Sequence, residues 1–168
     1  WFVDYRYEII NKDKKEYASL RDINIFIKPK IYITRTGNPF KAFIDENNFA
    51  SNNFFSIQYK DYELNSLDAL KPILGLLNSK FANYYIRKII APSLGNTFVE
   101  TKIIHLLKLP INNEILNSQE LTTKVDQILS LKKENPAADT SALEREIDFM
   151  VYALYGLSEE EISIVENS

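Results

Sequence analysis

The chain contains no cysteine, one histidine and only four glycines in its 168 residues. Without cysteine it can form neither disulfides nor thiolate metal sites. The four glycines are scattered, so the sequence carries no phosphate-binding loop and no dinucleotide fingerprint. The apolar runs stop well short of the length that spans a bilayer, and no leader with a cleavage site precedes them. We therefore expect no metal, no membrane partner and a cytoplasmic location.

What the chain does contain is typical of an ordered globular protein: 45% hydrophobic residues, 26% charged residues, ten Phe and ten Tyr. Its net charge of −3 is unevenly divided. Residues 1–110 hold 16 Lys and Arg against 11 Asp and Glu, a net +5, whereas residues 111–168 hold 4 against 12, a net −8. The basic part favours contact with a polyanion, although acidic helices are also common in soluble proteins. Because the sequence starts at Trp1 inside a strand-like run, we interpret it as a piece of a longer protein.

Short alternating runs rich in aromatic and β-branched residues predict strands in the first third of the chain. These runs are residues 4–10, 23–27, 30–35, 40–45 and 54–59. Turn clusters separate them, and the cluster TGNP at 36–39 offers Gly37 for a positive φ and Pro39 for a fixed exit. We expect a meander of antiparallel strands.

Helical periodicity dominates the rest of the chain. We predict one long helix from about Ser66 or Asp68 to Ile90, with Pro72 tolerated in its first turn, and a break at 91–98. Two helices of the acidic C-terminal part, 118–133 and 141–155, follow, and then a short one after Gly156. Their predicted capping boxes are Asn117 with Glu120, Ser141 with Glu144, and Ser158 with Glu161. The fold class is therefore α+β: a strand-rich part with a long helix, residues 1–110, and a C-terminal helical hairpin, residues 111–168.

Few residues are suited to catalysis. His105, the single histidine, lies in an apolar run, where a packed or surface histidine is more common than a general base. Glu100 and Lys102 have the Glu-x-Lys spacing of metal-dependent nucleases, but that spacing is also common on surfaces, and no upstream Asp on a neighbouring strand completes the site. We keep a nuclease using Glu100 and Lys102 as a minor alternative.

Two loops carry a set of side chains suited to binding DNA. Arg and Lys pair with guanine, Asn pairs with adenine, and short hydroxyls contact phosphates. The first loop holds Arg35, Thr36, Asn38 and Lys41, and the second holds Asn47, Asn48, Ser51, Asn52 and Asn53. Aromatic residues alternate with them at Phe40, Phe43, Phe49, Phe54 and Tyr59. The alternative is that the Asn-rich loops are ordinary turns and the aromatic residues are core.

Several segments together resemble the TaqI-like C-terminal specificity domain of adenine-specific DNA methyltransferases and fused restriction-modification enzymes. They are KPKIYITRTGNPFKAFIDENNFASNNFFSI, LKPILGLLNSKFANYYIRK with its Leu77-Asn78-Ser79-Lys80 core, and NTFVETKIIHLLKLPI with Leu109-Pro110-Ile111. The ending LEREIDFMVYALYGLSEEEISIVE is similar to the closing pattern of such enzymes. The likeness covers most of residues 20–166.

This resemblance implies a target-recognition domain, residues 1–110, that binds double-stranded DNA and lacks a catalytic centre. Methyl transfer would belong to an upstream domain that holds S-adenosylmethionine and flips the target base. Asn38-Pro39-Phe40 lacks the second proline of the family's catalytic motif. The parent would be an adenine methyltransferase, in fused members also a restriction endonuclease, and the acidic helices would brace the reader against the catalytic domain. The alternative from another class is a protein-interaction or scaffold module.

Carried over to this sequence, the resemblance gives roles only to loops and exposed cations. The base-edge readers would come from residues 35–41 and 47–53. The candidate phosphate contacts would be Lys80, Arg87, Lys88, Asn96 and Lys102. Tyr84 and Tyr85, on the predicted long helix, would be packing residues.

Overall fold

The computed structural model describes residues 24–37, 39–46, 48, 53–61, 64, 66–90 and 101–168. Within these ranges the chain is α+β, as predicted: a three-stranded antiparallel sheet precedes a series of helices. The strand predicted at 4–10 lies outside the described residues. No helix in the described part of the chain is long and apolar enough to cross a membrane.

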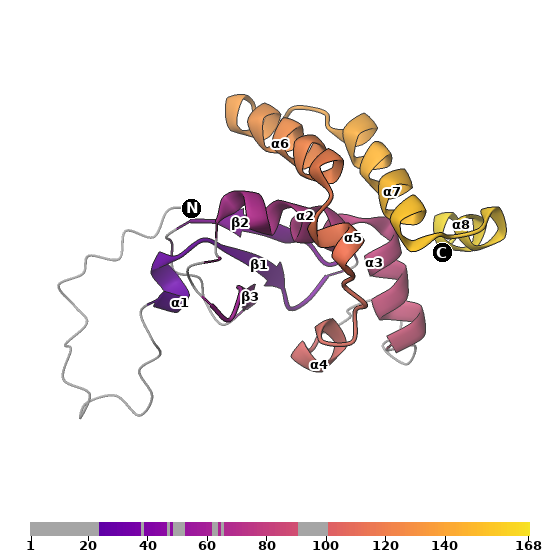
Figure 1. Cartoon of the computed structure of the whole chain (residues 1–168), viewed down its shortest axis with the longest axis horizontal. Coiled ribbons are helices and arrows are strands. Elements are labelled where there is room, and N and C mark those ends of the chain that lie inside the picture. The colour runs from indigo at the N-terminus through magenta and orange to yellow at the C-terminus, as the bar shows by residue number, and fades with distance from the viewer. Residues whose placement is uncertain are drawn as a thin grey trace.

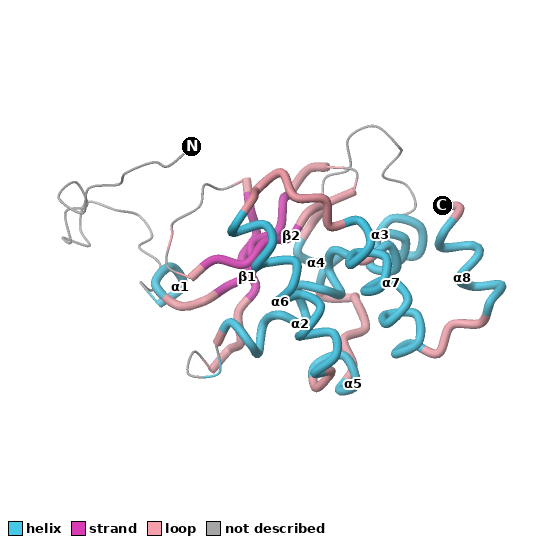
Figure 2. Tube along the Cα trace, turned by 90° about the horizontal axis from the view of Figure 1, so that it is seen from above, coloured by secondary structure: helices cyan, strands magenta, loops and turns pink. Residues whose placement is uncertain are grey.

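The elements form one small sheet and a series of helices, labelled in Figure 1 and coloured by type in Figure 2. The first part comprises α1 (Asn24–Ile27), β1 (Lys30–Thr34), β2 (Ala42–Asp45), β3 (Phe54–Ile57), α2 (Leu67–Asn78), α3 (Lys80–Tyr84) and the π-helical turn η3 (Tyr85–Ile90). The second comprises α4 (Ile103–Leu106), α5 (Asn113–Leu116), α6 (Gln119–Glu134), α7 (Ser141–Tyr155) and α8 (Glu159–Glu166).

The sheet has β1 at its centre, in the order β2-β1-β3, and both pairs are antiparallel. The strands predicted at 30–35, 40–45 and 54–59 are confirmed, but the meander is wrong, because β3 pairs with β1 and not with β2. The strand predicted at 23–27 is also wrong: its residues form the helical turn α1. The Lys30 ammonium donates to the carbonyl oxygens of Phe26 (2.6 Å) and Lys28 (3.2 Å), and a cation at a helix C-terminus stabilises that end.

Helix α2 is the central element of the core, and its residues 70–77 are all buried. The sheet contacts one side of α2 and α6 contacts another, so that sheet, α2 and the α6–α7 hairpin form successive layers (Figure 1). Gly75 permits the approach of α6, because a Cβ there would lie 2.9 Å from Leu121 Cδ1. Pro72 lies in the second turn of α2 and not in the first. Because proline has no N–H, the carbonyl of the exposed Asp68 lacks its intrahelical donor.

The single long helix predicted to end near Ile90 is interrupted at Ser79. This residue has an extended backbone (φ −70°, ψ 154°), and its hydroxyl accepts a hydrogen bond from the Ala82 N–H at 3.2 Å. Ser79 therefore caps a new helix, α3, and changes the direction of the chain after α2. The prediction failed because the apolar spacing continues through Ser79, which is itself buried.

The C-terminal helices agree with the predicted ranges, but two of their caps differ. Ser118, not Asn117, caps α6 by accepting from the Leu121 N–H at 3.2 Å. Thr140, not Ser141, precedes α7, and its hydroxyl donates to the Glu144 carboxylate at 2.6 Å. The box formed by Ser158 and Glu161 is confirmed, as is the end of α7 at Gly156, which has φ +65°. The short helix α5 was not predicted.

Candidate nucleic-acid interface

The turn at 35–41 joins β1 and β2 into a hairpin, as predicted. The Thr34 N–H donates to the Lys41 carbonyl at 3.0 Å, and the Lys41 N–H donates to the Thr34 hydroxyl at 3.0 Å. Gly37 has φ +147°, a backbone angle that residues other than glycine rarely adopt. Thr36 and Lys41 are exposed, whereas Asn38 lies outside the described residues. The hairpin thus presents two of its candidate readers to solvent.

Arg35 and Lys41 lie at different edges of the sheet. The Arg35 guanidinium is 5.2 Å from the Phe55 ring centroid on β3, and Arg35 lines an apolar groove of about 840 Å³ between β3 and α4. Lys41 lines a concavity of about 580 Å³ at the β2 edge, which residues of α6 and α7 share. The structure therefore does not bring these two cations to one binding point.

The second candidate loop is held by its own side chains. The Asn48 amide donates to one Asp45 oxygen at 2.7 Å, its backbone N–H donates to the other at 2.8 Å, and its carbonyl accepts from the Tyr32 hydroxyl at 2.9 Å. Burial raises the pKa of Asp45, but its bonds to Asn48 and its ion pair with Lys30 outweigh this and leave that pKa lowered. The Asn53 carbonyl accepts from the Arg35 N–H at 3.0 Å, which joins the two loops. Asn47, Ser51 and Asn52 lie outside the described residues.

The aromatic residues divide between core and surface. Phe40 is buried in the core, whereas Phe43 is 42% exposed. The Tyr32, Phe43 and Phe54 rings touch one another, with centroids 5.4 to 6.1 Å apart. Since Ile31 and Ile33 belong to the core shared with α2, the alternation of β1 places this aromatic cluster on the other face of the sheet.

The Leu77-Asn78-Ser79-Lys80 segment is the joint of the fold. The Asn78 amide donates to the Ala42 carbonyl at 2.9 Å and accepts from the Ala42 N–H at 3.0 Å, so it pairs with the outer edge of β2 as a further strand would. The Asn83 amide oxygen accepts from the N–H of Phe40, two residues before β2, at 3.2 Å. Together these two amides satisfy backbone groups of an edge strand and hold the 35–41 hairpin against the helices.

Lys80, a predicted phosphate contact, is already engaged. Its backbone N–H donates to the buried carboxylate of Asp148 at 2.8 Å, and its ammonium lies 2.5 Å from the Glu166 carboxylate. The other Glu166 oxygen accepts from the Tyr152 hydroxyl at 2.7 Å. The bonds from Lys80 and Tyr152 hold the pKa of Glu166 below its ordinary value, so the carboxylate is ionised. Burial and the bond to Glu166 raise the pKa of Tyr152.

Three of the candidate cations share one concavity of about 260 Å³, which α3, η3 and the C-terminal end of α8 line. Lys80, Arg87 and Lys88 line it together with Tyr84 and Glu166. Lys80 and Lys88 are exposed, and Arg87 is half-buried. The π-helical turn η3 places Arg87 and Lys88 in succession at the C-terminal end of this run, where the helix dipole favours cations. This concavity is the densest group of candidate phosphate contacts that the described residues form.

The remaining candidates lie apart from that concavity. Lys102 is exposed and precedes α4, where its N–H donates to His105 Nδ1 at 3.2 Å. Partial burial, with the charges of Lys102 and Lys108, lowers the pKa of His105. Asn96 and Glu100 lie outside the described residues, and within the described ranges no three His, Cys, Asp or Glu side chains are grouped to hold a metal ion.

Sequence reasoning missed two features of this region. Glu166 reaches Lys80 from a helix 86 residues away along the chain, Tyr152 of α7 holds Glu166 in turn, and no local pattern signals such contacts. The exposed apolar residues of α4 and its flank, Ile103 (56%), Ile104 (58%) and Leu107 (79%), were also missed, although the sequence alone shows a run too apolar for a solvated helix.

Comparison with known families gives one match. The family model described as the TaqI-like C-terminal specificity domain matches residues 2–111, about two thirds of the chain. No curated protein matches. The matched range includes the sheet, the joint at Asn78 and the cation-lined run of α3 and η3, and it ends before the helices α6, α7 and α8.

Proposed function

The chain belongs to the family of TaqI-like C-terminal specificity domains, and from this membership we propose that it recognises a specific sequence in double-stranded DNA. Membership implies a target-recognition role within restriction-modification proteins. We propose further that the parent is an adenine-specific DNA methyltransferase whose upstream domain binds S-adenosylmethionine, and that this part lacks the catalytic centre. The family match over residues 2–111 is the observation that carries the proposal.

Charge and geometry support the same function. The basic excess lies in residues 1–110, and the acidic excess lies in the helices that follow. Helices α6 and α7 pack on α2, on the side away from the sheet (Figure 1). A duplex that approached the sheet and η3 would meet Arg87 and Lys88, and the one carboxylate among the described residues that line their concavity is Glu166 of α8, the most acidic of the helices. Among the candidate base readers of the 35–41 and 47–53 loops, the described residues Arg35, Thr36, Lys41, Asn48 and Asn53 border the same sheet.

In this arrangement the two sets of contacts have different tasks. Lys88, Arg87 and Lys102 would bind phosphates, which supplies affinity and orientation without sequence information. Arg35 and the exposed residues Thr36 and Lys41 would approach base edges. The domain boundary near residue 110 and the bracing role of residues 111–168 belong to this proposal.

The test is DNA binding by the full-length protein, measured by fluorescence anisotropy over a range of salt concentrations. Lys88→Gln removes one exposed cation of the concavity, and Lys133→Gln, on exposed α6 surface, is the matched control. Loss of one phosphate contact should weaken binding to all duplexes alike and reduce the salt slope by about 0.9. The control should behave as the wild type.

Two results would count against the proposal. If the wild type binds no duplex even at low salt, DNA recognition is wrong and the protein-interaction alternative is favoured. If Lys88→Gln and Lys133→Gln change the salt slope equally, the cation concavity is not the phosphate-binding surface.

A further inference from the structure

Glu166 lies where an anion would bind. Its carboxylate faces Lys80 in the concavity that Arg87 and Lys88 also line. It is the one acidic side chain among the residues that line this concavity in the described part of the chain. A carboxylate and a phosphate compete for the same ammonium group, because each offers ionised oxygens to the same N–H donors.

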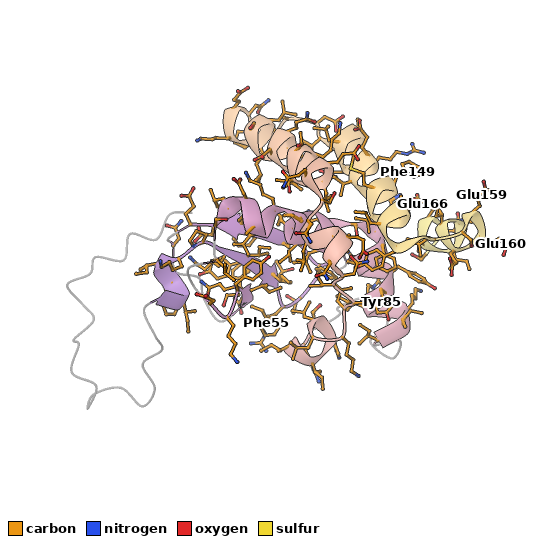
Figure 3. The ribbon with its side chains drawn as sticks, in the orientation of Figure 1. Phe55, Tyr85, Phe149, Glu159, Glu160 and Glu166 are labelled. Carbon is orange, nitrogen blue, oxygen red and sulfur yellow. The ribbon has the colours of Figure 1, made fainter. Side chains whose placement is uncertain are left out.

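The carboxylate is held in a defined position. Tyr152 is 1% exposed, and its hydroxyl donates to Glu166 Oε1 at 2.7 Å, while Lys80 Nζ contacts Glu166 Oε2 at 2.5 Å. In Figure 3 Glu166 lies at the inner end of α8 beside α7, and Glu159 and Glu160 lie at the outer end. One acidic residue of α8 is therefore directed at the concavity, and at least two are not.

Helix α8 is attached to the rest of the chain by one narrow face. Val165 is its one fully buried residue and Ile162 packs on the core at its edge, whereas Ile164 is 56% exposed. The Lys80 and Glu166 side chains are themselves 51% and 30% exposed, so water and salt screen their ion pair. In such a screened ion pair, an anion that binds more strongly can displace the Glu166 carboxylate from Lys80.

We propose that Glu166 is an internal competitor for the phosphate-binding concavity: its carboxylate occupies Lys80 in the free protein, and a DNA phosphate displaces it. This inference rests on the proposed DNA-binding function. A duplex phosphate gains from Lys80, Lys88 and Arg87 together and from the release of its counterions, which the carboxylate of one side chain cannot match. The competition lowers affinity for DNA that offers too few contacts.

A competing role for Glu166 can be distinguished from a purely structural one, in which Glu166 only holds α8 against α3 and α7. If Glu166 only fastens α8, its removal can only weaken or leave unchanged the binding of DNA. If Glu166 competes with phosphate, its removal strengthens binding, because the phosphate no longer has to displace a carboxylate from Lys80. The direction of the change therefore distinguishes the two roles.

The experiment compares four forms of the full-length protein in anisotropy titrations with duplex DNA at several salt concentrations. They are the wild type, Glu166→Gln, the control Glu160→Gln and the double variant Glu166→Gln with Lys80→Gln. Glutamine keeps an acceptor for the Tyr152 hydroxyl, and Glu160→Gln makes the same change of net charge on the exposed outer end of α8. A melting curve for each form checks that it is folded.

We expect Glu166→Gln to bind about two- to fivefold more tightly than Glu160→Gln, the range of an exposed ion pair. Its salt slope should equal that of Glu160→Gln, because the same phosphates are bound, and the double variant should lose the gain in affinity and have a slope lower by about 0.9. Equal affinity of Glu166→Gln and Glu160→Gln, or a gain that persists without Lys80, would overturn the inference while leaving DNA recognition intact. Absence of binding in all four forms would overturn the proposed function and this inference with it.

Discussion

Replacing Asn78 with alanine tests whether the joint after α2 supports the sheet edge. The change removes the two hydrogen bonds that the Asn78 amide makes with the Ala42 backbone, at 2.9 and 3.0 Å. Asn78 is exposed, so water can reach the groups that are left unpaired. The loss is therefore the net value of ordinary hydrogen bonds and does not include a full desolvation penalty.

The magnitude follows from these two bonds. Each contributes about 1 kcal/mol net to the free energy of unfolding, which gives about 2 kcal/mol for the pair. Alanine has a higher helix propensity than asparagine, which returns about 0.5 kcal/mol. We expect a net loss of about 1.5 kcal/mol, and at this chain length that corresponds to a melting temperature lower by about 3 to 6 °C.

Urea unfolding followed by circular dichroism measures the loss, and Gln127→Ala on the exposed face of α6 is the control. Asn78→Asp is a second variant of equal size: it keeps an acceptor for the Ala42 N–H but loses the donor to the Ala42 carbonyl. It should also be less stable than the wild type. The reasoning is refuted if Asn78→Ala has the same unfolding midpoint as Gln127→Ala.

Two further predictions concern buried charges. Lys30 is fully buried, and its ammonium lies 3.0 Å from the Asp45 carboxylate. Lys30→Met should therefore lower the free energy of unfolding, measured in urea, by about 3 kcal/mol, and adding Asp45→Asn should recover part of that loss. No recovery would contradict the pairing. Burial raises the pKa of Asp148 above its ordinary value of 3.8, which the bond from the Lys80 N–H only partly opposes. The stability that Asp148 contributes is therefore complete below pH 3.8 and falls as pH rises through the raised pKa. Wild type should lose stability relative to Asp148→Asn between pH 3 and pH 7, and a difference in unfolding free energy that does not vary with pH would contradict this.

Local patterns were sufficient to predict much of the fold. Alternation along 30–35, 40–45 and 54–59 identified three strands, and Gly156 marked the end of α7, because both signals depend on neighbours in the sequence. Strand order was not predictable in this way. That β3 pairs with β1 depends on contacts across the sheet, which the spacing of apolar residues does not encode.

Errors arose where side-chain contacts override a local preference. The run predicted as a strand at 23–27 is rich in β-branched residues, yet Asn24–Ile27 forms a helical turn, and the Phe26 carbonyl accepts from the Lys30 ammonium. Ser79 lies within helical spacing, yet it begins a new helix whose first N–H reaches Asp148 on α7. Asp148 is 68 residues from Lys80 and lies outside the window in which periodicity is read, whereas Lys30 is only four residues from Phe26.

The candidate site shows the same limit more clearly. The family resemblance, together with residue type, predicted cations such as Lys88 as phosphate contacts, and Lys88 is exposed. Residue type could not show that Lys80 has a partner on α8 or that Asn48 is bound to Asp45. The sequence thus predicted which residues are suited to DNA, and the structure changes which of them are available.

The Leu77-Asn78-Ser79-Lys80 segment connects these results. Each of its residues faces a different part of the molecule: Leu77 the core, Asn78 the β2 edge, Ser79 the start of α3, and Lys80 the helices α7 and α8. The segment that carried the family resemblance therefore has structural roles beside the proposed phosphate contact of Lys80. It fixes the 35–41 hairpin relative to the cations of α3 and η3, and a reader of DNA needs that fixed relation because base contacts and phosphate contacts must meet the same duplex together.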